Sequence, residues 1–366
     1  MKDPATRTGL ALSGGGFRAS LFHLGVLRCL NDLGALRDFS RISSVSGGSI
    51  TAGVLAHAWR ELSFDHQDRA TNFDERVTQP LRRFASHTLD IKAGVFGLLP
   101  FVGPASVLQK AYAKSLVGKA TLQDLPSDEE GPRFIFNAAN LQTGVLFRMS
   151  RPYMADWKLG QWAAPTLPLA TAMAASSAFP PFFSPLIVKP GALPENPDPE
   201  FEQTHSKMYQ RLCNRILLTD GGVYDNFGSE PLKGFPVVVL SDAGKRLEEA
   251  QRPLLDWFSQ LLRIRAMYDD QVRALRVRWL AEKFDRQETN GVYFSMRGEQ
   301  ITRGDWDNGT SASASFSEIS KIPTRLKALP QAKQELLITC GAQHCLASLR
   351  KAKSLGALPG PLGDRV

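Results

Sequence analysis

The chain of 366 residues contains no apolar stretch that approaches the roughly 20 residues a membrane-spanning helix needs. Its first eight residues have no apolar core of the kind that signal peptides carry. Four scattered cysteines, Cys29, Cys213, Cys340 and Cys345, form no CxxC pair, which favours reduced thiols over a disulfide framework. A zinc site on Cys340, His344 and Cys345 would lack a fourth ligand at a suitable spacing. The sequence therefore predicts a cytoplasmic protein without a metal site.

The composition is that of an ordinary globular protein. Hydrophobic residues make up 43% of the chain and charged residues 22%, which excludes bulk disorder and leaves ample apolar side chains for a core. The net charge of +8 favours an anionic partner, either nucleic acid or a negatively charged membrane face. Lys and Arg are spread along the chain, so charge alone does not choose between these partners.

The first sixty residues alternate strands and helices. A short apolar strand leads into a glycine turn and a helix with its leucines on one stripe, and the same order then repeats. This order is the pattern of a parallel sheet covered by helices. The predicted segments are strand 9–13, glycine turn 14–16, helix 17–33, strand 41–45, turn 46–48 and helix 50–59.

Later segments complete the same fold class. We predict α/β architecture, with three α/β/α layers and a mainly parallel central sheet, in one domain over residues 1–366. The motif-bearing core covers about 9–240, and 241–366 supply a completing strand and helices. The further strands are 133–137, 146–149, 216–218 and 237–240, the last two as central parallel strands. An edge strand is predicted at 293–296, an arginine-rich helix at 254–284 and closing helices at 327–352.

Two segments break the regular pattern. Residues 94–103 are apolar, but their Gly and Pro content argues against a regular element. They are a candidate lid or membrane contact, and a buried loop is an equal alternative. Residues 189–211 are Pro-rich at first and lie between two apolar strands, so we predict a surface insertion, most simply a loop.

The glycine turn Gly14-Gly15-Gly16 suits a bound anion. Glycines let backbone amides approach a ligand, and the following helix adds positive charge at its N-terminus. Such a turn holds a phosphate or a developing oxyanion. A dinucleotide site would need an acidic residue at the end of the second strand, and Asp38 precedes that strand instead. Nucleotide binding is therefore the second choice.

The second turn resembles a nucleophile elbow, with Ser46 between a strand and a helix and Gly48 two positions later. Ser44 stands where the G-x-S-x-G pattern has its first glycine, and a small residue still meets the steric demand. We predict Ser46 as the nucleophile, and Ser43, Ser44 and Ser49 as structural residues.

A serine hydroxyl needs a base to remove its proton. None of the six histidines follows a convincing strand end, and His23 in the first helix is better explained as a packed side chain. Asp220 ends an apolar strand and precedes Gly221-Gly222. Because active sites of parallel sheets gather at the carboxyl ends of strands, we expect Asp220 to lie beside Ser46.

Together these three motifs resemble the patatin-like phospholipase family. They are Gly14-Gly15-Gly16-Phe17-Arg18, Ser44-Val45-Ser46-Gly47-Gly48 and Asp220-Gly221-Gly222, and the segment 174–183 resembles the family's segment between nucleophile and aspartate. The resemblance covers about residues 9–240. It implies hydrolysis of lipid acyl esters by a Ser46–Asp220 dyad without histidine, through an acyl-enzyme.

The resemblance also implies roles around the dyad. Gly14, Gly15 and Gly16 would form the oxyanion hole, and Arg18 would support this loop or attract a phosphate. Because an ordinary aspartate is a weak base, we expect Asp220 to be shielded from water. No cofactor is implied.

Membrane phospholipid is the expected substrate, with peripheral membrane association of a cytoplasmic protein and no nucleic-acid partner. Two alternatives stay open: a general carboxylesterase or thioesterase with the same dyad, and a nucleotide- or lipid-binding protein with a silent site. The sequence is silent on a homo-oligomer or protein activator.

Overall fold

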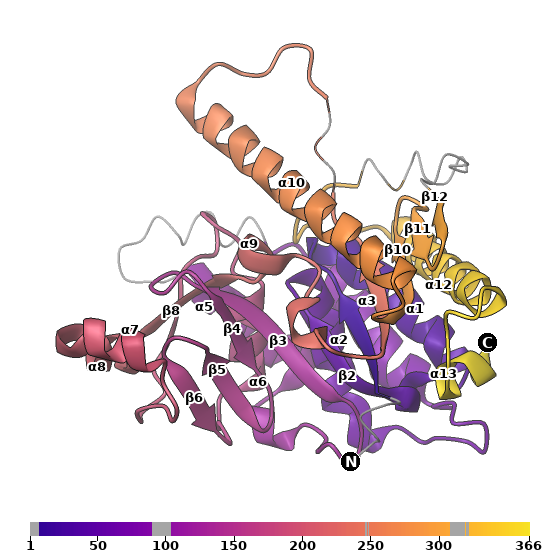
Figure 1. Ribbon diagram of the computed structural model, residues 1–366, viewed down its shortest axis with the longest axis horizontal. Helices are drawn as coiled ribbons and strands as arrows, with labels where there is room; N and C mark the ends of the chain where they lie inside the picture. Colours follow the sequence, from indigo (N-terminus) through magenta and orange to yellow (C-terminus); the bar gives the residue numbers. More distant parts are fainter. Residues whose placement is uncertain (1–6, 90–103, 246, 248, 308–318, 320–321) are drawn as a thin grey trace.

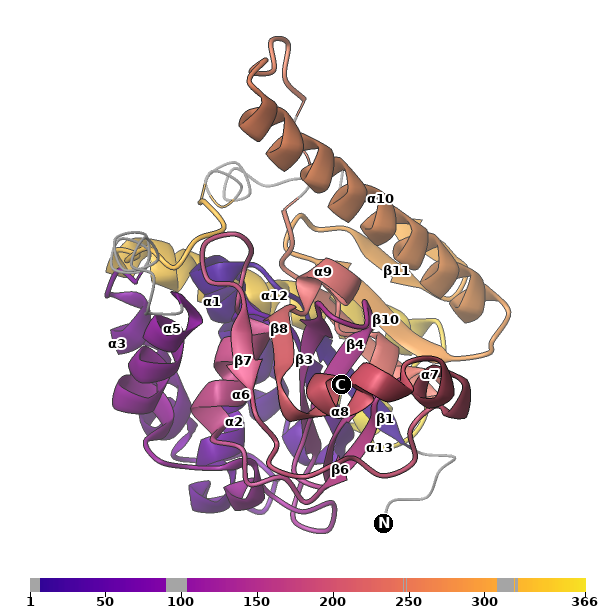
Figure 2. The ribbon, with the colours of Figure 1, turned by 90° about the vertical axis from the view of Figure 1, so that its left-hand side faces the viewer.

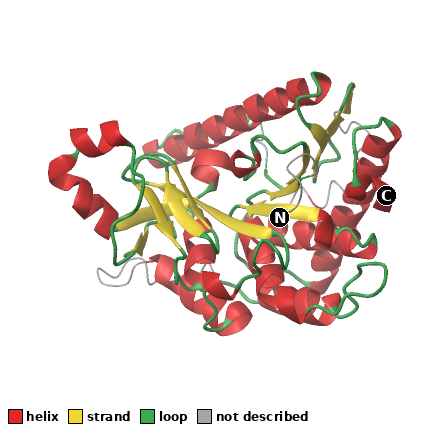
Figure 3. Cartoon of the chain, turned by 60° about the horizontal axis from the view of Figure 1, so that its bottom comes forward, coloured by secondary structure: helices red, strands yellow, loops and turns green. Residues whose placement is uncertain are grey.

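A computed structural model describes residues 7–89, 104–245, 247, 249–307, 319 and 322–366. Twelve strands in these residues form one mixed sheet, with helices on both faces (Figures 1 and 3). The strands are β1 (Thr8–Leu12), β2 (Phe39–Ser44), β3 (Arg133–Asn140), β4 (Leu146–Met149), β5 (Tyr153–Asp156), β6 (Gly160–Ala163), β7 (Leu186–Val188), β8 (Ile216–Asp220), β9 (Val237–Asp242), β10 (Asn290–Ser295), β11 (Gln300–Thr302) and β12 (Asp305–Asp307).

The helices cover this sheet unequally. Most of them lie on one face, and α10 crosses the other (Figure 3). The helices are α1 (Gly16–Asp32), α2 (Gly47–Ala58), α3 (Gln79–Ala85), α5 (Pro104–Tyr112), α6 (Leu169–Ser176), α7 (Pro199–Thr204), α8 (Ser206–Asn214), α9 (Gly222–Asp225), α10 (Trp257–Asp285), α12 (Gln331–Ser354) and α13 (Pro361–Arg365).

The sheet is parallel at its centre and antiparallel at its flanks. Strands β10, β9, β1, β2 and β3 pair in parallel in that order, whereas β4, β5 and β6 continue antiparallel on one side and β11 and β12 on the other. The predicted three-layer α/β/α fold is confirmed. The predicted edge strand at 293–296 is wrong in position, because β10 lies between β9 and β11 and Tyr293 is fully buried.

Alternate side chains of the central strands belong to two separate hydrophobic cores, one on each face of the sheet. On β9, Val237 and Val239 pack into the large core beneath α1 and α12, while Val238 and Leu240 face the smaller core beneath α10. Alternating side chains of a strand point to opposite faces, so a continuous apolar run is required where both faces are covered. The C-terminal half of α10 closes the smaller core with Val277, Leu280 and Phe284.

The prediction for strand β8 was also wrong. The strand was expected to be a central parallel strand, but it pairs antiparallel with the far half of β3. Its partners there are Ala138, Ala139 and Asn140, beyond the part of β3 that pairs with β2. Strands β2 and β8 therefore approach each other head-on along β3, each with its carboxyl end toward the other.

The structure describes one of the two irregular segments, residues 189–211, and not the other, residues 94–103. Residues 189–211 were expected to be a loop, but they contain α7, which begins at the last proline, Pro199, and most of α8, and both helices lie on the surface (Figure 1). Asp198 caps α7 by accepting a hydrogen bond from the Phe201 amide at 2.8 Å. Residues 94–103 lie outside the described residues.

Candidate active site

Ser46 occupies a strained turn between β2 and α2. Its φ and ψ angles are 51° and −118°, a conformation that non-glycine residues rarely adopt. The turn requires glycine beside it, because a Cβ atom on Gly47 would lie 2.2 Å from the carbonyl oxygen of Gly16. The Ser46 side chain is half-buried and remains accessible. The chain thus holds one serine in a high-energy conformation at a helix N-terminus.

The neighbouring serines are buried and hydrogen-bonded. The Ser44 hydroxyl donates to the carbonyl oxygen of Ile135 at 3.2 Å and lies 2.9 Å from the Ser49 hydroxyl. The Ser43 hydroxyl accepts a hydrogen bond from Asn137 at 2.9 Å. A hydroxymethyl group therefore fits at position 44, where the usual pattern has glycine, because its polar atom is satisfied within the core.

Asp220 reaches Ser46 through the head-on approach of β8 and β2. Ser44 pairs with Phe136 and Asp220 pairs with Ala138, so two residues of β3, about 7 Å, separate the two strand ends. The expectation that Asp220 lies beside Ser46 on the sheet agrees with the structure. The expected route, side-by-side parallel strands, does not.

A residue that the sequence analysis gave no role, Ser176, fixes both strand ends. The Ser46 amide donates to the carbonyl oxygen and to the hydroxyl of Ser176, each at 3.1 Å, and the Gly221 amide donates to the same carbonyl at 3.3 Å. The carbonyl of Ala178 accepts from the Asp220 amide at 3.0 Å. The end of α6 thus clamps the serine turn to the aspartate turn. Its signal was the small-residue segment 174–178, whose contacts depend on tertiary structure.

The Asp220 carboxyl is shielded from water, as its expected chemistry requires. The residue is 3% exposed, and its Oδ1 accepts a hydrogen bond from the Gly222 amide at 2.8 Å. Burial raises the pKa of Asp220 to about 6, against the lowering effects of the Gly222 amide, the Ser46 hydroxyl and Arg265. Such a carboxylate is a stronger base than an exposed aspartate.

The contact between Ser46 and Asp220 is close but is not a well-formed hydrogen bond. The Ser46 hydroxyl is near enough to affect the Asp220 pKa, yet Oδ2 of Asp220 accepts no well-formed hydrogen bond from the described residues. One acceptor of Asp220 is therefore buried and open toward the serine.

The glycine loop lies against the serine turn. A Cβ atom on Gly14 would lie 3.1 Å from the Ser46 Cβ, and Gly15 and Gly16 adopt φ angles of 145° and 60°. The Gly14 amide donates to the carbonyl of Asn226 at 2.9 Å, so it is not free for an oxyanion as expected. Within the described residues, the amides of Gly15 and Gly16 have no such acceptor.

Arg18 is buried behind this loop and is not a surface anion site. It is 1% exposed and donates to the carbonyl oxygens of Ala243 at 3.0 Å and Ile322 at 3.3 Å. This placement fits support of the loop. A bound phosphate would have to displace these carbonyls.

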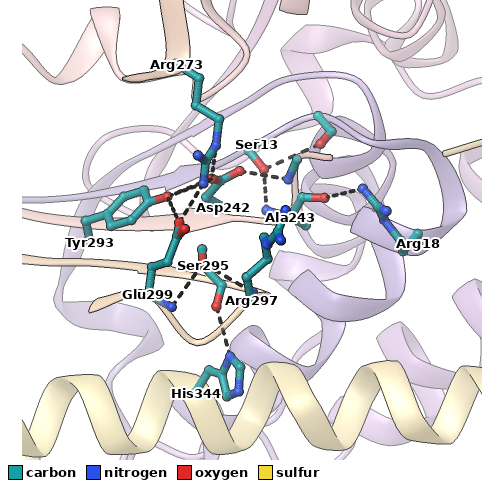
Figure 4. A network of polar contacts seen from close by, with 12 residues as sticks. Ser13, Arg18, Asp242, Ala243, Arg273, Tyr293, Ser295, Arg297, Glu299 and His344 are labelled. Carbon is teal, nitrogen blue, oxygen red and sulfur yellow. Dashed lines mark hydrogen bonds and ion pairs between the residues drawn. The ribbon is translucent and has the colours of Figure 1, made fainter. Parts of the chain in front are cut away.

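Behind the glycine loop lies a buried ionic network, shown in Figure 4. Arg273 of α10 lies 2.6 Å from Asp242 and 2.9 Å from Glu299, and the Tyr293 hydroxyl donates to Asp242 at 2.8 Å. Burial acts against ionisation of Asp242, but Arg273 and the hydrogen bonds hold its pKa below the usual value. The next residue, Ala243, donates its amide to the Ser13 hydroxyl at 2.7 Å. The network therefore ties α10 to the segment that supports the glycine loop.

No histidine serves this site. All six histidines are described, and none hydrogen-bonds Ser46 or Asp220. His23 is fully buried between the Ser13 carbonyl and the Ser241 hydroxyl, and burial lowers its pKa to about 4. His23 is therefore neutral and structural. Across the described ranges, no cluster of three or more His, Cys, Asp or Glu side chains is arranged to hold a metal ion.

Fold and site together define an α/β protein in which a serine at a strained strand–helix turn faces a buried carboxylate. The chain belongs to the patatin-like phospholipase family, whose model matches residues 10–233. The resemblance seen in the sequence is therefore confirmed, and the family supports a lipid acyl hydrolase. No curated protein matches the chain.

Solved structures are similar in fold. Human GIVD cytosolic phospholipase A2 is 11% identical with a TM-score of 0.54, covering 100% of this chain and 64% of that chain. The same human enzyme in complex with methyl gamma-linolenyl fluorophosphonate inhibitor and terbium chloride is 12% identical with a TM-score of 0.52, covering 96% of this chain and 60% of that chain. VipD from Legionella pneumophila is 15% identical with a TM-score of 0.41, covering 95% of this chain and 67% of that chain. The chain spans less than two thirds of the human enzyme, and at 11% and 12% identity the likeness to that enzyme shows the fold alone.

None of the helices in the described residues is long and apolar enough to cross a bilayer.

Proposed function

We propose that the chain is a phospholipase A-type hydrolase that cleaves fatty-acyl esters of membrane glycerophospholipids with Ser46 and Asp220. Family membership supports the lipid-ester chemistry. The observation that carries the dyad is the buried Asp220 carboxyl, with a pKa raised to about 6, one open oxygen and Ser46 as its neighbour. A base with this pKa is ionised at neutral pH and is still basic enough to assist a serine.

In the first half-reaction, the Ser46 hydroxyl oxygen attacks the ester carbonyl carbon and its proton passes to the Asp220 carboxylate. The tetrahedral oxyanion accepts hydrogen bonds from the Gly15 and Gly16 amides at the N-terminus of α1. Collapse breaks the ester bond, and the departing lysolipid alkoxide takes the proton from Asp220. The fatty acyl group is left on Ser46.

In the second half-reaction, Asp220 removes a proton from water, which attacks the acyl-serine carbonyl. The same amides receive the new oxyanion. Its collapse returns the proton to the Ser46 oxygen and releases the fatty acid. No group beyond the chain and water is consumed in either step.

The test is release of fatty acid from phosphatidylcholine vesicles, followed by mass spectrometry. We expect Ser46→Ala and Asp220→Asn to lower kcat by a factor on the order of 10⁴, as loss of a reacting group does elsewhere. A short-chain soluble ester, run in parallel, separates a phospholipase from a general esterase.

Asp225→Asn is the matched control. Asp225 is fully buried in the same motif, but its carboxylate accepts from the Phe227 and Glu230 amides and not from Ser46. We expect this variant to lose stability while kcat per folded molecule falls less than about tenfold. Equal losses in Asp220→Asn and Asp225→Asn would reject Asp220 as the base. Cleavage of the short ester without vesicle hydrolysis would reject the phospholipid substrate.

A further inference from the structure

Large apolar side chains are exposed along one segment, residues 254–279, which covers most of α10 and the three residues before it. More than half of the large exposed apolar residues in the described part of the chain lie there. They include Leu254 and Leu255, 70% and 83% exposed, just before α10 begins. Exposed apolar patches of this extent mark an interaction surface.

Within α10 these residues form a straight stripe. We define the outer stripe as seven residues that are each 40–77% exposed: Trp257, Leu261, Ile264, Tyr268, Val272, Leu275 and Trp279. They follow spacings of four, three, four, four, three and four, close to the 3.6 residues of a helical turn, so they share one face. At a rise of about 1.5 Å per residue, this face is about 33 Å long. An aromatic residue recurs at every eleventh position.

One flank of α10, next to the outer stripe, contacts the protein at the active site: Arg265 is four residues after Leu261, one helical turn away. Arg265 donates to the carbonyl of Pro180 at 3.3 Å and lies 4.3 Å from the centre of the Phe179 ring. Arg265 and Asp269 both act electrostatically on Asp220. The N-terminal half of α10 thus passes near the dyad along the flank that carries Arg265 and Asp269, and the outer stripe lies beside this flank. Figure 2 shows this half extending beyond the body of the molecule.

Apolar exposure continues onto the rim of the site. Phe179 and Phe182 are 40% and 52% exposed in the segment that follows α6. Val223, three residues after Asp220, is 47% exposed. Because Arg265 lies next to the outer stripe on α10 and packs on Phe179, the outer stripe and this rim are neighbouring apolar surfaces beside the dyad.

We infer that the outer stripe and the rim are the surface by which the protein docks on a phospholipid bilayer. The inference rests on the proposed function, because the bilayer is where that substrate lies. Trp, Tyr and Phe suit the boundary between headgroups and acyl chains, and the net charge of +8 favours an anionic membrane surface. A second copy on the same surface would cover the entrance to the dyad, whereas a bilayer on it would present the substrate.

Vesicle co-sedimentation tests the docking surface without hydrolysis. The protein carries Ser46→Ala, and the vesicles contain phosphatidylcholine and phosphatidylserine. We expect the added pair Trp257→Ser and Leu261→Ser to weaken binding at least tenfold, because two large apolar side chains no longer leave water. Binding by the parent should persist at about 1 M salt, where charges are screened beyond about 3 Å.

The matched control is Trp157→Ser with Leu355→Ser. These side chains are 57% and 43% exposed, and they lie between β5 and β6 and at the end of α12, away from the outer stripe. We expect the control pair to bind vesicles like the parent, and both pairs to keep the parent's melting temperature.

Several results would overturn the inference: no vesicle binding by the parent, its complete loss in high salt, or equal binding by the stripe variant. If the stripe pair turned a dimer into a monomer in light scattering and left vesicle binding unchanged, a second copy would be the occupant. Because the assay uses Ser46→Ala, failure of the proposed hydrolysis leaves its result readable. The vesicle assay therefore tests the docking surface independently of the proposed catalytic dyad.

Discussion

The candidate active site and the outer stripe of α10 differ in their exposure to water. Around Ser46 and Asp220 the backbone amides are held by the carbonyls of Ser176 and Ala178, and Asp220 is 3% exposed. On the outer stripe of α10, large apolar side chains stand in solvent at up to 77% exposure. Directional hydrogen bonds fix atoms to fractions of an ångström, whereas apolar contact is non-directional. The first region is suited to holding reacting groups in a fixed geometry, and the second is suited to binding an apolar surface.

The two regions meet at Arg273. N-terminal to it α10 extends outward, and C-terminal to it Val277, Leu280 and Phe284 are buried in the smaller core. Arg273 itself contacts Asp242, whose neighbour Ala243 bonds Ser13 and Arg18 beside the glycine loop. This buried ionic network therefore joins α10, which carries the outer stripe, to the segment behind the glycine loop.

Arg273→Met should break this junction with the largest effect on folding. It leaves Asp242 and Glu299 as buried carboxylates without their cation, which costs about 3–5 kcal/mol when one partner is removed. Denaturant unfolding measures the loss. Arg278→Met, an exposed change on the same helix, is the control and should cost less than about 0.5 kcal/mol. A loss below about 1 kcal/mol for Arg273→Met would show that the network does not hold α10.

Gly16→Ala should damage the catalytic region selectively. Its φ is 60°, and the added Cβ would lie 2.7 Å from the carbonyl oxygen of Arg325, so the loop must shift. We expect kcat to fall about 10²–10³-fold with little change in KM, the size of an oxyanion-donor loss.

Gly118→Ala controls for backbone strain alone. Gly118 has a φ of 58°, with open space where its Cβ would stand. It should cost about 1–2 kcal/mol of stability and leave kcat unchanged. Equal effects of the two changes on kcat would argue against a role for the Gly16 amide.

The smallest effect is expected on the outer stripe. Leu275 is 58% exposed and Leu280, five residues later on the same helix, is 7% exposed. Leu275→Ala should change the unfolding free energy by less than about 0.5 kcal/mol, and Leu280→Ala should lower it by about 2–5 kcal/mol. Comparable losses at both positions would mean that the stripe is covered within the protein in solution.

Sequence reasoning found what local patterns encode. The glycine turn, the Ser46 turn and the Asp220 turn each need small residues within a few positions, so their composition identifies them. The direction of β8 was not predictable from its apolar run, because such a run fits a parallel or an antiparallel strand buried on both faces. The clamp by Ser176 was also missed, since its partner Ser46 lies 130 residues earlier in the chain and its partner Gly221 follows only after two further strands.

The outer stripe was missed for another reason. Residues 254–284 were correctly predicted to be helical, as an arginine-rich helix. Apolar residues at helical spacing usually face a core, and only the fold reveals that here the smaller core takes Val277, Leu280 and Phe284 on the opposite face and leaves the outer stripe in solvent. Arg18 shows the reverse case, since a charged residue beside a glycine loop is in fact buried and bonded to carbonyls.

The most direct test of the account is the rate at which a fluorophosphonate, which traps activated serines, labels the protein between pH 4.5 and 8. Peptide mass spectrometry then locates the adduct. In the proposed dyad the base is the ionised form of Asp220, whose pKa burial raises to about 6. The account predicts an adduct on Ser46 and a rate that rises about tenfold per pH unit below 6 and levels above it. In Asp220→Asn the rate should be low at every pH. An adduct on another residue, or a pH profile unchanged by Asp220→Asn, would contradict the dyad.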